Sequence, residues 1–197
     1  MAENSAAPAP GAPSDVLMAI YTGDRDRALA LAAGVTLTLP ELAALGDVAP
    51  LAARLREAAV DVQERSPDGW TALHLAGFVG AAGALALLVR AGADLRARAH
   101  NAQGNTPLHA AIAGRCDAAC VAALVAAGCD VAVPDAHGYT PLHLAASRGN
   151  DGITELLVAC GAARDLLATD GRTPASIARE RGHSGLADRL ERHDAWS

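Results

Sequence analysis

The stretch TPLHLAASRGN, Thr140 to Asn150, decides the fold because it recurs along the chain. Related segments begin at Thr71 (TALHLAGFVG), Thr106 (TPLHAAIAGR) and Thr173 (TPASIARERG), so the four starting points are 35, 34 and 33 residues apart. Each segment follows a turn pair that contains glycine, and a second apolar segment follows each one. A multi-residue pattern that returns at a nearly constant period is the sequence signature of a repeat architecture.

Each repeat is predicted to be a turn followed by two short helices. The threonine can cap the N-terminus of the first helix, and Pro107, Pro141 and Pro174 fall at its first position, where the missing N–H costs nothing. Two short helices cannot bury their apolar faces alone, so neighbouring units must stack around a shared core. The glycines expected to end the first and second helices are Gly80, Gly149 and Gly182, and Gly92, Gly128 and Gly161.

Composition supports closely packed helices and restricts the partners. The chain of 197 residues is 51% apolar but 3% aromatic, so alanine, leucine and valine must supply its core. All 16 basic residues are arginine, and against 22 acidic residues they leave a formal charge of -6. This charge balance argues against nucleic acid and anionic membrane as partners. The first residues have neither the basic start nor the apolar run of a secretory signal.

Four cysteines, Cys116, Cys120, Cys129 and Cys160, lie in apolar helical patterns and lack the paired C-x-x-C spacing of a zinc site. We interpret them as reduced core residues of a cytoplasmic protein, with no cofactor and no metal. The alternative is a metal- or redox-responsive accessory protein to an enzyme, in which the region of Cys116, Cys120 and Cys129 acts as the sensor.

The repeated units resemble ankyrin repeats, whose turn-plus-two-helices pattern carries T-P-L-H-x-A at a period of 33 residues. The resemblance covers residues 66–192 by motif and is that of a small, stand-alone stack of bacterial type. It implies an all-α solenoid of about six helix-pair units, including a cap at each end. The expected divisions are a disordered leader (1–13) and a repeat domain (14–197) made of an N-terminal cap (14–38), a degenerate repeat (39–65), three repeats (66–100, 101–134 and 135–168) and a C-terminal cap (169–197).

His74, His109 and His143 are one structural position used three times. The resemblance implies that each imidazole bonds to the threonine three residues earlier and reaches backbone of the next unit. A shared metal ion is disfavoured, since neighbouring units separate their imidazoles by roughly 10 Å, about one helix diameter. The sequence holds no nucleophile elbow and no phosphate-binding loop, so we expect no enzymatic activity.

Function is therefore expected on the surface, as binding of another protein by a monomer. The resemblance implies that the variable positions at the turn tips and at the ends of the first helices form one concave face. Tyr21, Trp70, Phe78 and Tyr139 fall on it, and aromatic and arginine side chains are typical interface anchors. For Phe78 and Val79, packing inside the stack is an equally good interpretation. The candidate partner-binding residues are Trp70, Phe78, Val79, Asn105, Tyr139, Arg148 and Arg172.

Overall fold

The computed structural model describes residues 12–192, which form twelve α-helices. Within this range the β-type pairing is confined to one isolated bridge between Arg65 and Thr71, and the predicted all-α class is confirmed. Most of the predicted leader, and residues 193–197 of the predicted C-terminal cap, lie outside the described residues. The helices are α1 (Asp15–Tyr21), α2 (Arg25–Ala32), α3 (Leu39–Leu45), α4 (Val48–Arg54), α5 (Ala72–Val79), α6 (Ala82–Arg90), α7 (Pro107–Ala113), α8 (Ala118–Ala126), α9 (Pro141–Ser147), α10 (Asp151–Ala159), α11 (Pro174–Glu180) and α12 (Ser184–Glu191).

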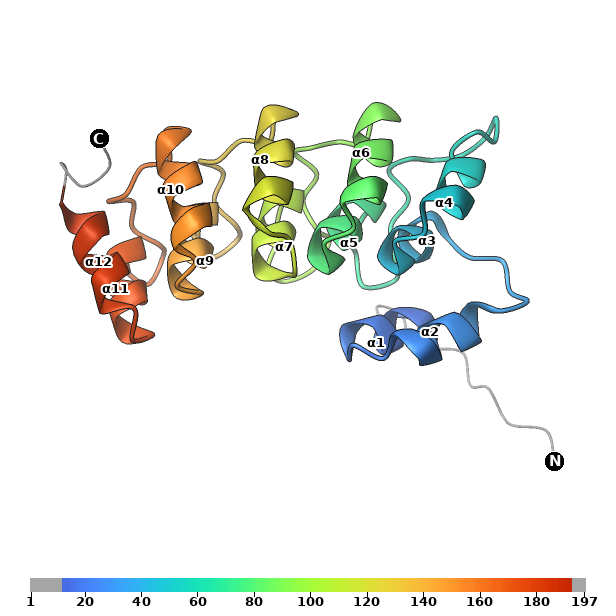
Figure 1. The fold of residues 1–197 in the computed structure, drawn as a ribbon, viewed down its shortest axis with the longest axis horizontal. Helices are drawn as coiled ribbons and strands as arrows, with labels where there is room; N and C mark the ends of the chain where they lie inside the picture. Colours follow the sequence, from blue (N-terminus) through green and yellow to red (C-terminus); the bar gives the residue numbers. More distant parts are fainter. Residues whose placement is uncertain (1–11, 193–197) are drawn as a thin grey trace.

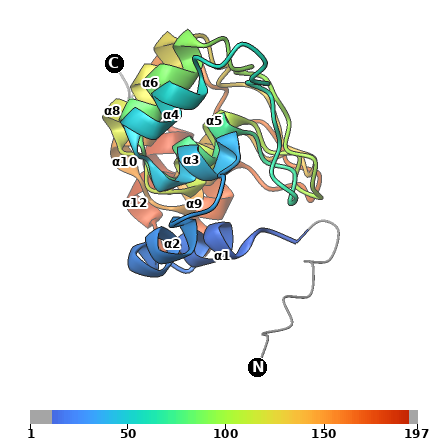
Figure 2. The ribbon, with the colours of Figure 1, turned by 90° about the vertical axis from the view of Figure 1, so that its right-hand side faces the viewer.

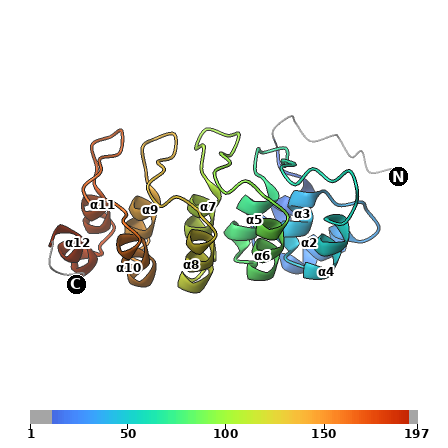
Figure 3. The same cartoon turned by 90° about the horizontal axis from the view of Figure 1, so that it is seen from above.

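From α3 onward the helix pairs stack side by side into an elongated body (Figure 1). The first helix of each pair (α3, α5, α7, α9 and α11) belongs to an inner layer, and the second helix belongs to an outer layer. The turns between pairs project in a row from one side of the helices (Figure 3). One apolar core runs through the stack from Leu39 to Leu190, as expected when each unit buries its face against its neighbours.

The same local chemistry builds each inner helix. Thr71, Thr106, Thr140 and Thr173 are the N-cap residues of α5, α7, α9 and α11, and proline begins the last three of these helices, as predicted. The leucine two residues after the threonine is buried in each of the three central units, at Leu73, Leu108 and Leu142. Thus one residue pattern produces one packing position, repeated along the stack.

Backbone hydrogen bonds also join the turns of successive units. The N–H groups of His100, Ala136 and Thr169 donate to the carbonyls of Gly69, Gln103 and His137, each at 2.9 Å. Gly69 has a φ of +88°, and a Cβ placed there would lie 2.5 Å from the His100 carbonyl oxygen. A residue with a side chain would therefore clash at this turn, which explains the glycine.

The N-terminal pair α1–α2 does not continue the inner and outer layers. It lies across the inner-layer side of α3 and α5 (Figures 1 and 2). Leu17 of α1 is buried against Ala44 of α3 and Leu75 of α5, so α1 touches the first two units of the stack. The side chain of Arg25 in α2 donates to the Leu45 carbonyl at the end of α3 (2.6 Å). The pair therefore covers part of the surface that the sequence assigned to a partner.

Candidate partner-binding surface

The three repeated histidines connect consecutive units. His109 is fully buried; its Nδ1 lies 2.8 Å from the Thr106 hydroxyl, and its Nε2 lies 3.0 Å from the carbonyl oxygen of Tyr139 in the next unit. His74 and His143 repeat this arrangement, with Nε2 at 2.9 Å from the Asn105 carbonyl and 3.2 Å from the Arg172 carbonyl. The threonine contacts implied by the resemblance are present at all three positions.

These contacts define the protonation state of each imidazole. A backbone carbonyl can only accept, so Nε2 carries the proton and donates it, while Nδ1 accepts from the threonine. Burial in an apolar setting disfavours the charged ring; it lowers the pKa of His74 to about 4 and also lowers the pKa of His109 and of His143. Both ring nitrogens are thus engaged inside the protein, which supports a structural role.

Three aromatic side chains gather where α1 covers the inner layer. The rings of Tyr21 and Phe78 meet edge to face at 5.9 Å, and Trp70 packs against the cluster of Leu17, Ala44 and Leu75. The Tyr21 hydroxyl donates to the Asp68 carboxylate (2.8 Å). Burial is the main cause that raises the pKa of Tyr21, and the bond to Asp68 adds to it. Trp70 and Phe78 are therefore half-buried under the N-terminal pair rather than open to solvent.

Val79 lies at the edge of the same contact. It lines a small cavity together with Ile20, Gly23 and Arg25 of the N-terminal pair. A partner could reach Trp70, Phe78 and Val79 together only if α1–α2 moved away. Their role in partner binding stays a prediction, and the sequence pattern did not anticipate what covers them.

Tyr139, Arg148 and Arg172 lie in the part of the inner layer that α1–α2 leaves uncovered. The Tyr139 hydroxyl donates to the Asp170 carboxylate and accepts from Arg172, whose guanidinium lies 5.5 Å from the centre of the tyrosine ring. Arg172 also pairs with Asp170 (2.7 Å) and Glu180 (3.1 Å). The hydrogen bond to Asp170 raises the pKa of Tyr139, and the Arg172 guanidinium beside it lowers the pKa of Asp170. The phenol is thus a neutral hydroxyl group at neutral pH.

Arg148 is exposed, and it is anchored at one end. Its Nη1 donates to the Ala113 carbonyl (2.8 Å) and its Nη2 to the Gly114 carbonyl (3.3 Å), both at the C-terminus of α7. Asn105 is half-buried in the turn before α7, where its carbonyl accepts from His74. The structure thus brings Tyr139, Arg148 and Arg172 together at one cavity, whereas Asn105 does not line that cavity.

Equivalent repeat positions show that the inner-layer surface has a half covered by α1–α2 and an open half. Leu75 and Leu144 are the fourth residue after the threonine in their units. Leu75 is 1% exposed because Leu17 of α1 covers it, whereas Leu144 is only partly buried and lines an open cavity. We define the open half as the inner-layer surface of α9 and α11 with the turns before them.

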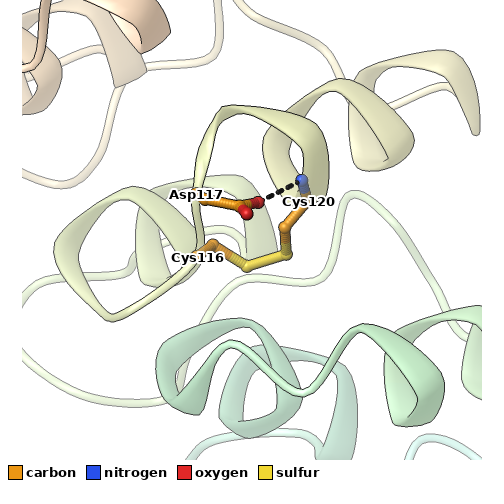
Figure 4. The surroundings of a disulfide bond; sticks show 3 residues. All are labelled: Cys116, Asp117 and Cys120. Atoms are coloured by element: carbon orange, nitrogen blue, oxygen red, sulfur yellow. Dashed lines mark hydrogen bonds between the residues drawn. A yellow bond between two sulfur atoms is a disulfide. The ribbon is translucent and has the colours of Figure 1, made fainter.

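The interpretation of all four cysteines as reduced core residues holds in full for one of them; Cys116 and Cys120 are core residues but are not reduced, and Cys160 is free but does not lie in the core. Cys116 and Cys120 form a disulfide (Figure 4), and Cys160 is exposed. Cys116 lies just before the N-cap Asp117 of α8 and not within the helix; its Cα is 5.4 Å from that of Cys120. Only Cys129 matches the prediction: it is free and buried, and burial raises the pKa of its thiol to about 11.

The predicted cytoplasmic location was based on four reduced cysteines, and the disulfide removes that basis. The location itself stays a prediction. In the described part of the chain, no group of three or more His, Cys, Asp or Glu side chains could hold a metal ion. None of the helices in residues 12–192 is long and apolar enough to cross a membrane.

Comparison with known proteins places these features in a family. A family model described as "Ankyrin repeats (3 copies)" matches residues 41–135 and 113–195. The RelA-associated inhibitor of Mus musculus is 49% identical over 63 residues, which are 32% of this chain and 8% of that protein. The nuclear factor NF-kappa-B p105 subunit of Mus musculus is 35% identical over 114 residues, 54% of this chain and 11% of that protein.

The chain therefore spans about a tenth of the length of these curated relatives, 8% and 11%. Both relatives are mouse proteins, so they give no support to the expected bacterial type.

Proposed function

The chain belongs to the ankyrin-repeat family, and from this membership we propose that it is a non-enzymatic module that binds another protein on the open half of its inner-layer surface. The observation that carries this proposal is the contrast between Leu75 and Leu144. Leu75 is buried under α1, whereas Leu144 at the same repeat position is partly exposed. The side chains around Leu144 line an open cavity and are not needed to fill the core.

The residues proposed to contact the partner are Tyr139, Arg148 and Arg172. Tyrosine and arginine combine a large contact area with directed hydrogen bonds, and both are enriched among residues that dominate binding energy. The ion pairs of Arg172 hold its guanidinium and the Tyr139 ring in place before a partner arrives. A surface that is already ordered loses less side-chain entropy on binding.

Trp70, Phe78 and Val79 take a different part in this proposal. They bind the chain's own N-terminal pair, and they would meet a partner only after that pair is displaced. Asn105, in the turn between the two halves, would contact the partner at the edge of the open half. We also propose that the module acts as a monomer.

The relatives support the class of partner. The printed name of one of them, RelA-associated inhibitor, describes a protein that associates with another protein. The comparisons lend no support to the metal- or redox-responsive accessory protein, and we do not propose that function.

Affinity capture from cells with quantitative mass spectrometry tests the proposal. The test variant is Ser147→Trp, which places bulk in the open half, and the matched control is Ala123→Trp on the exposed face of α8. We expect the tryptophan at position 147 to reduce recovery of the specific partner at least about tenfold, since a blocked contact of about 1.4 kcal/mol suffices for that change. Recovery that falls equally with the Ala123→Trp control, or that is unchanged in both, would refute this location of the binding site.

A further inference from the structure

The open half contains a cavity of about 330 Å³ between α9 and α11. Its walls include Tyr139, Leu144, Ser147 and three arginines, Arg148, Arg172 and Arg181. A cavity with this lining offers an apolar floor, two hydroxyl groups and a concentration of positive charge. The chain as a whole carries a formal charge of -6, so the arginines of this cavity have the opposite sign to the net charge of the protein.

The arginines recur with the repeat. Arg115, Arg148 and Arg181 are spaced by 33 residues, and each is exposed just after the end of an inner helix (α7, α9 and α11). The two preceding units carry glycine there, Gly46 after α3 and Gly80 after α5. The Arg115 guanidinium lies beside Gly23, between α1 and α2, because a Cβ added to Gly23 would lie 3.2 Å from Nη2 of Arg115. The row of arginines therefore begins at the edge of the surface that α1–α2 covers.

These three arginines lack acidic partners within the described residues. Arg172 is neutralised by Asp170 and Glu180, but none of the ion pairs found in residues 12–192 involves Arg115, Arg148 or Arg181. Arg148 uses two N–H groups on the end of α7, and a guanidinium has five, so it keeps donors for a further acceptor. Arginine is the side chain best matched to the geometry of a carboxylate.

We propose that Arg115, Arg148 and Arg181 bind an extended acidic segment of a partner protein, with carboxylates at about every third residue. Adjacent inner helices pack roughly 8–10 Å apart, so the arginines repeat at about that interval. A segment in the extended polyproline II conformation advances about 3.1 Å per residue with three residues per turn, so every third side chain lies on the same side, about 9.3 Å from the next. Leu144 would contact an aliphatic side chain between two acidic ones, while Tyr139 and Ser147 offer hydroxyl groups to the segment.

Nucleic acid is the other polyanion that could meet these arginines. Asp170 and Glu180 lie beside the cavity, held by Arg172, and their charge opposes a dense row of phosphates. An extended peptide with spaced carboxylates can avoid these two groups, so the observations favour the peptide.

The inference rests on the proposed function and names the chemistry of its partner. Fluorescence anisotropy of a short labelled peptide tests it, with glutamate at every third position and leucine or glycine between. The comparison probes are the same sequence with glutamine for glutamate, the same composition with glutamate at every second position, and a single-stranded DNA of equal length. We expect the first peptide to bind the intact chain most tightly, and its affinity to fall as salt is raised.

The double variant Arg148→Gln/Arg181→Gln should weaken binding of that peptide at least about tenfold, because each arginine supplies charge-assisted hydrogen bonds. The charge-matched control Arg90→Gln, on exposed α6 residue Arg90, should leave the affinity unchanged. Since Arg148 also supports the end of α7, Arg181→Gln alone is measured as well and should weaken binding at least about threefold.

Equal binding of the glutamine peptide, tighter binding of the DNA, or an unchanged affinity in both arginine variants would overturn the inference. Equal affinity for the peptide with glutamate at every second position would overturn the spacing. If Ser147→Trp still abolishes partner capture while the acidic peptide fails to bind, this inference falls and the proposed function stands. If neither the partner nor the peptide depends on the open half, both fall.

Discussion

Replacing His109 with alanine tests how the stack holds together. The ring is fully buried and joins Thr106 of its own unit to the carbonyl of Tyr139 in the next. Loss of two hydrogen bonds removes about 0.5–1.5 kcal/mol each, and the Tyr139 carbonyl is left without this donor. The cavity left by the ring adds a further loss, as in other large-to-small substitutions in a core. We expect the free energy of unfolding to fall by about 3 kcal/mol.

Urea denaturation of the parent and the variant, followed by circular dichroism, measures this change. The control is His100→Ala, since the His100 side chain is exposed in a turn and its backbone N–H is unaffected by the substitution. We expect the control to unfold within about 0.5 kcal/mol of the parent. A loss below about 1 kcal/mol for His109→Ala, or an equal loss for both variants, would refute the reasoning that the imidazole is a structural bridge.

Three further predictions concern protonation, aromatic packing and thiol access. Burial lowers the pKa of His74 from 6.5 to about 4, so between these two pH values the folded state binds fewer protons than the unfolded chain. The contribution of His74 to the free energy of unfolding is therefore full above pH 6.5 and falls toward pH 4 by about 1.4 kcal/mol per pH unit. Urea denaturation curves that do not change across this window would contradict the prediction. In urea denaturation, Trp70→Ala should lower the free energy of unfolding by about 2 kcal/mol, because Trp70 packs under α1. Tyr139→Ala should stay within about 1 kcal/mol of the parent. The reverse order would show that the covered and open halves of the inner-layer surface are assigned wrongly. Mass spectrometry after a short maleimide pulse should find Cys160 labelled and Cys129 unlabelled in the native protein, and rapid labelling of Cys129 would place it at the surface.

The sequence predicts those structural features whose contacts lie within one repeat unit or between successive repeat units. Thr106 is the N-cap of α7 and His109 is the third residue of that helix, so the contact that the resemblance implied between them lies within one unit. The starts of α7, α9 and α11 also follow, because Pro107, Pro141 and Pro174 fit the first helical position. These features need no knowledge of distant segments.

The cover over Trp70 and Phe78 could not be predicted in this way. It depends on a contact between Tyr21 and a unit that lies two helix pairs further along the chain, and no periodicity encodes that contact. The signal available was that Tyr21, Trp70 and Phe78 fell on one face of a chain with few aromatics; such side chains can pack on one another as readily as on a partner. Cys116 was misplaced because α8 begins only after the N-cap Asp117, so Cys116 lies in the preceding loop, where its sulfur bonds to that of Cys120.

Site-specific photo-crosslinking tests the central claim, that the open half binds a partner protein, most directly. A photoreactive phenylalanine analogue replaces Tyr139 in one protein and the exposed outer-layer residue Ala86 in another, and crosslinked peptides are identified by mass spectrometry. The account predicts a crosslink to a partner protein from position 139, on a segment with spaced acidic residues, and none from position 86. Crosslinks from position 86 alone, or equal crosslinking from both positions, would contradict it.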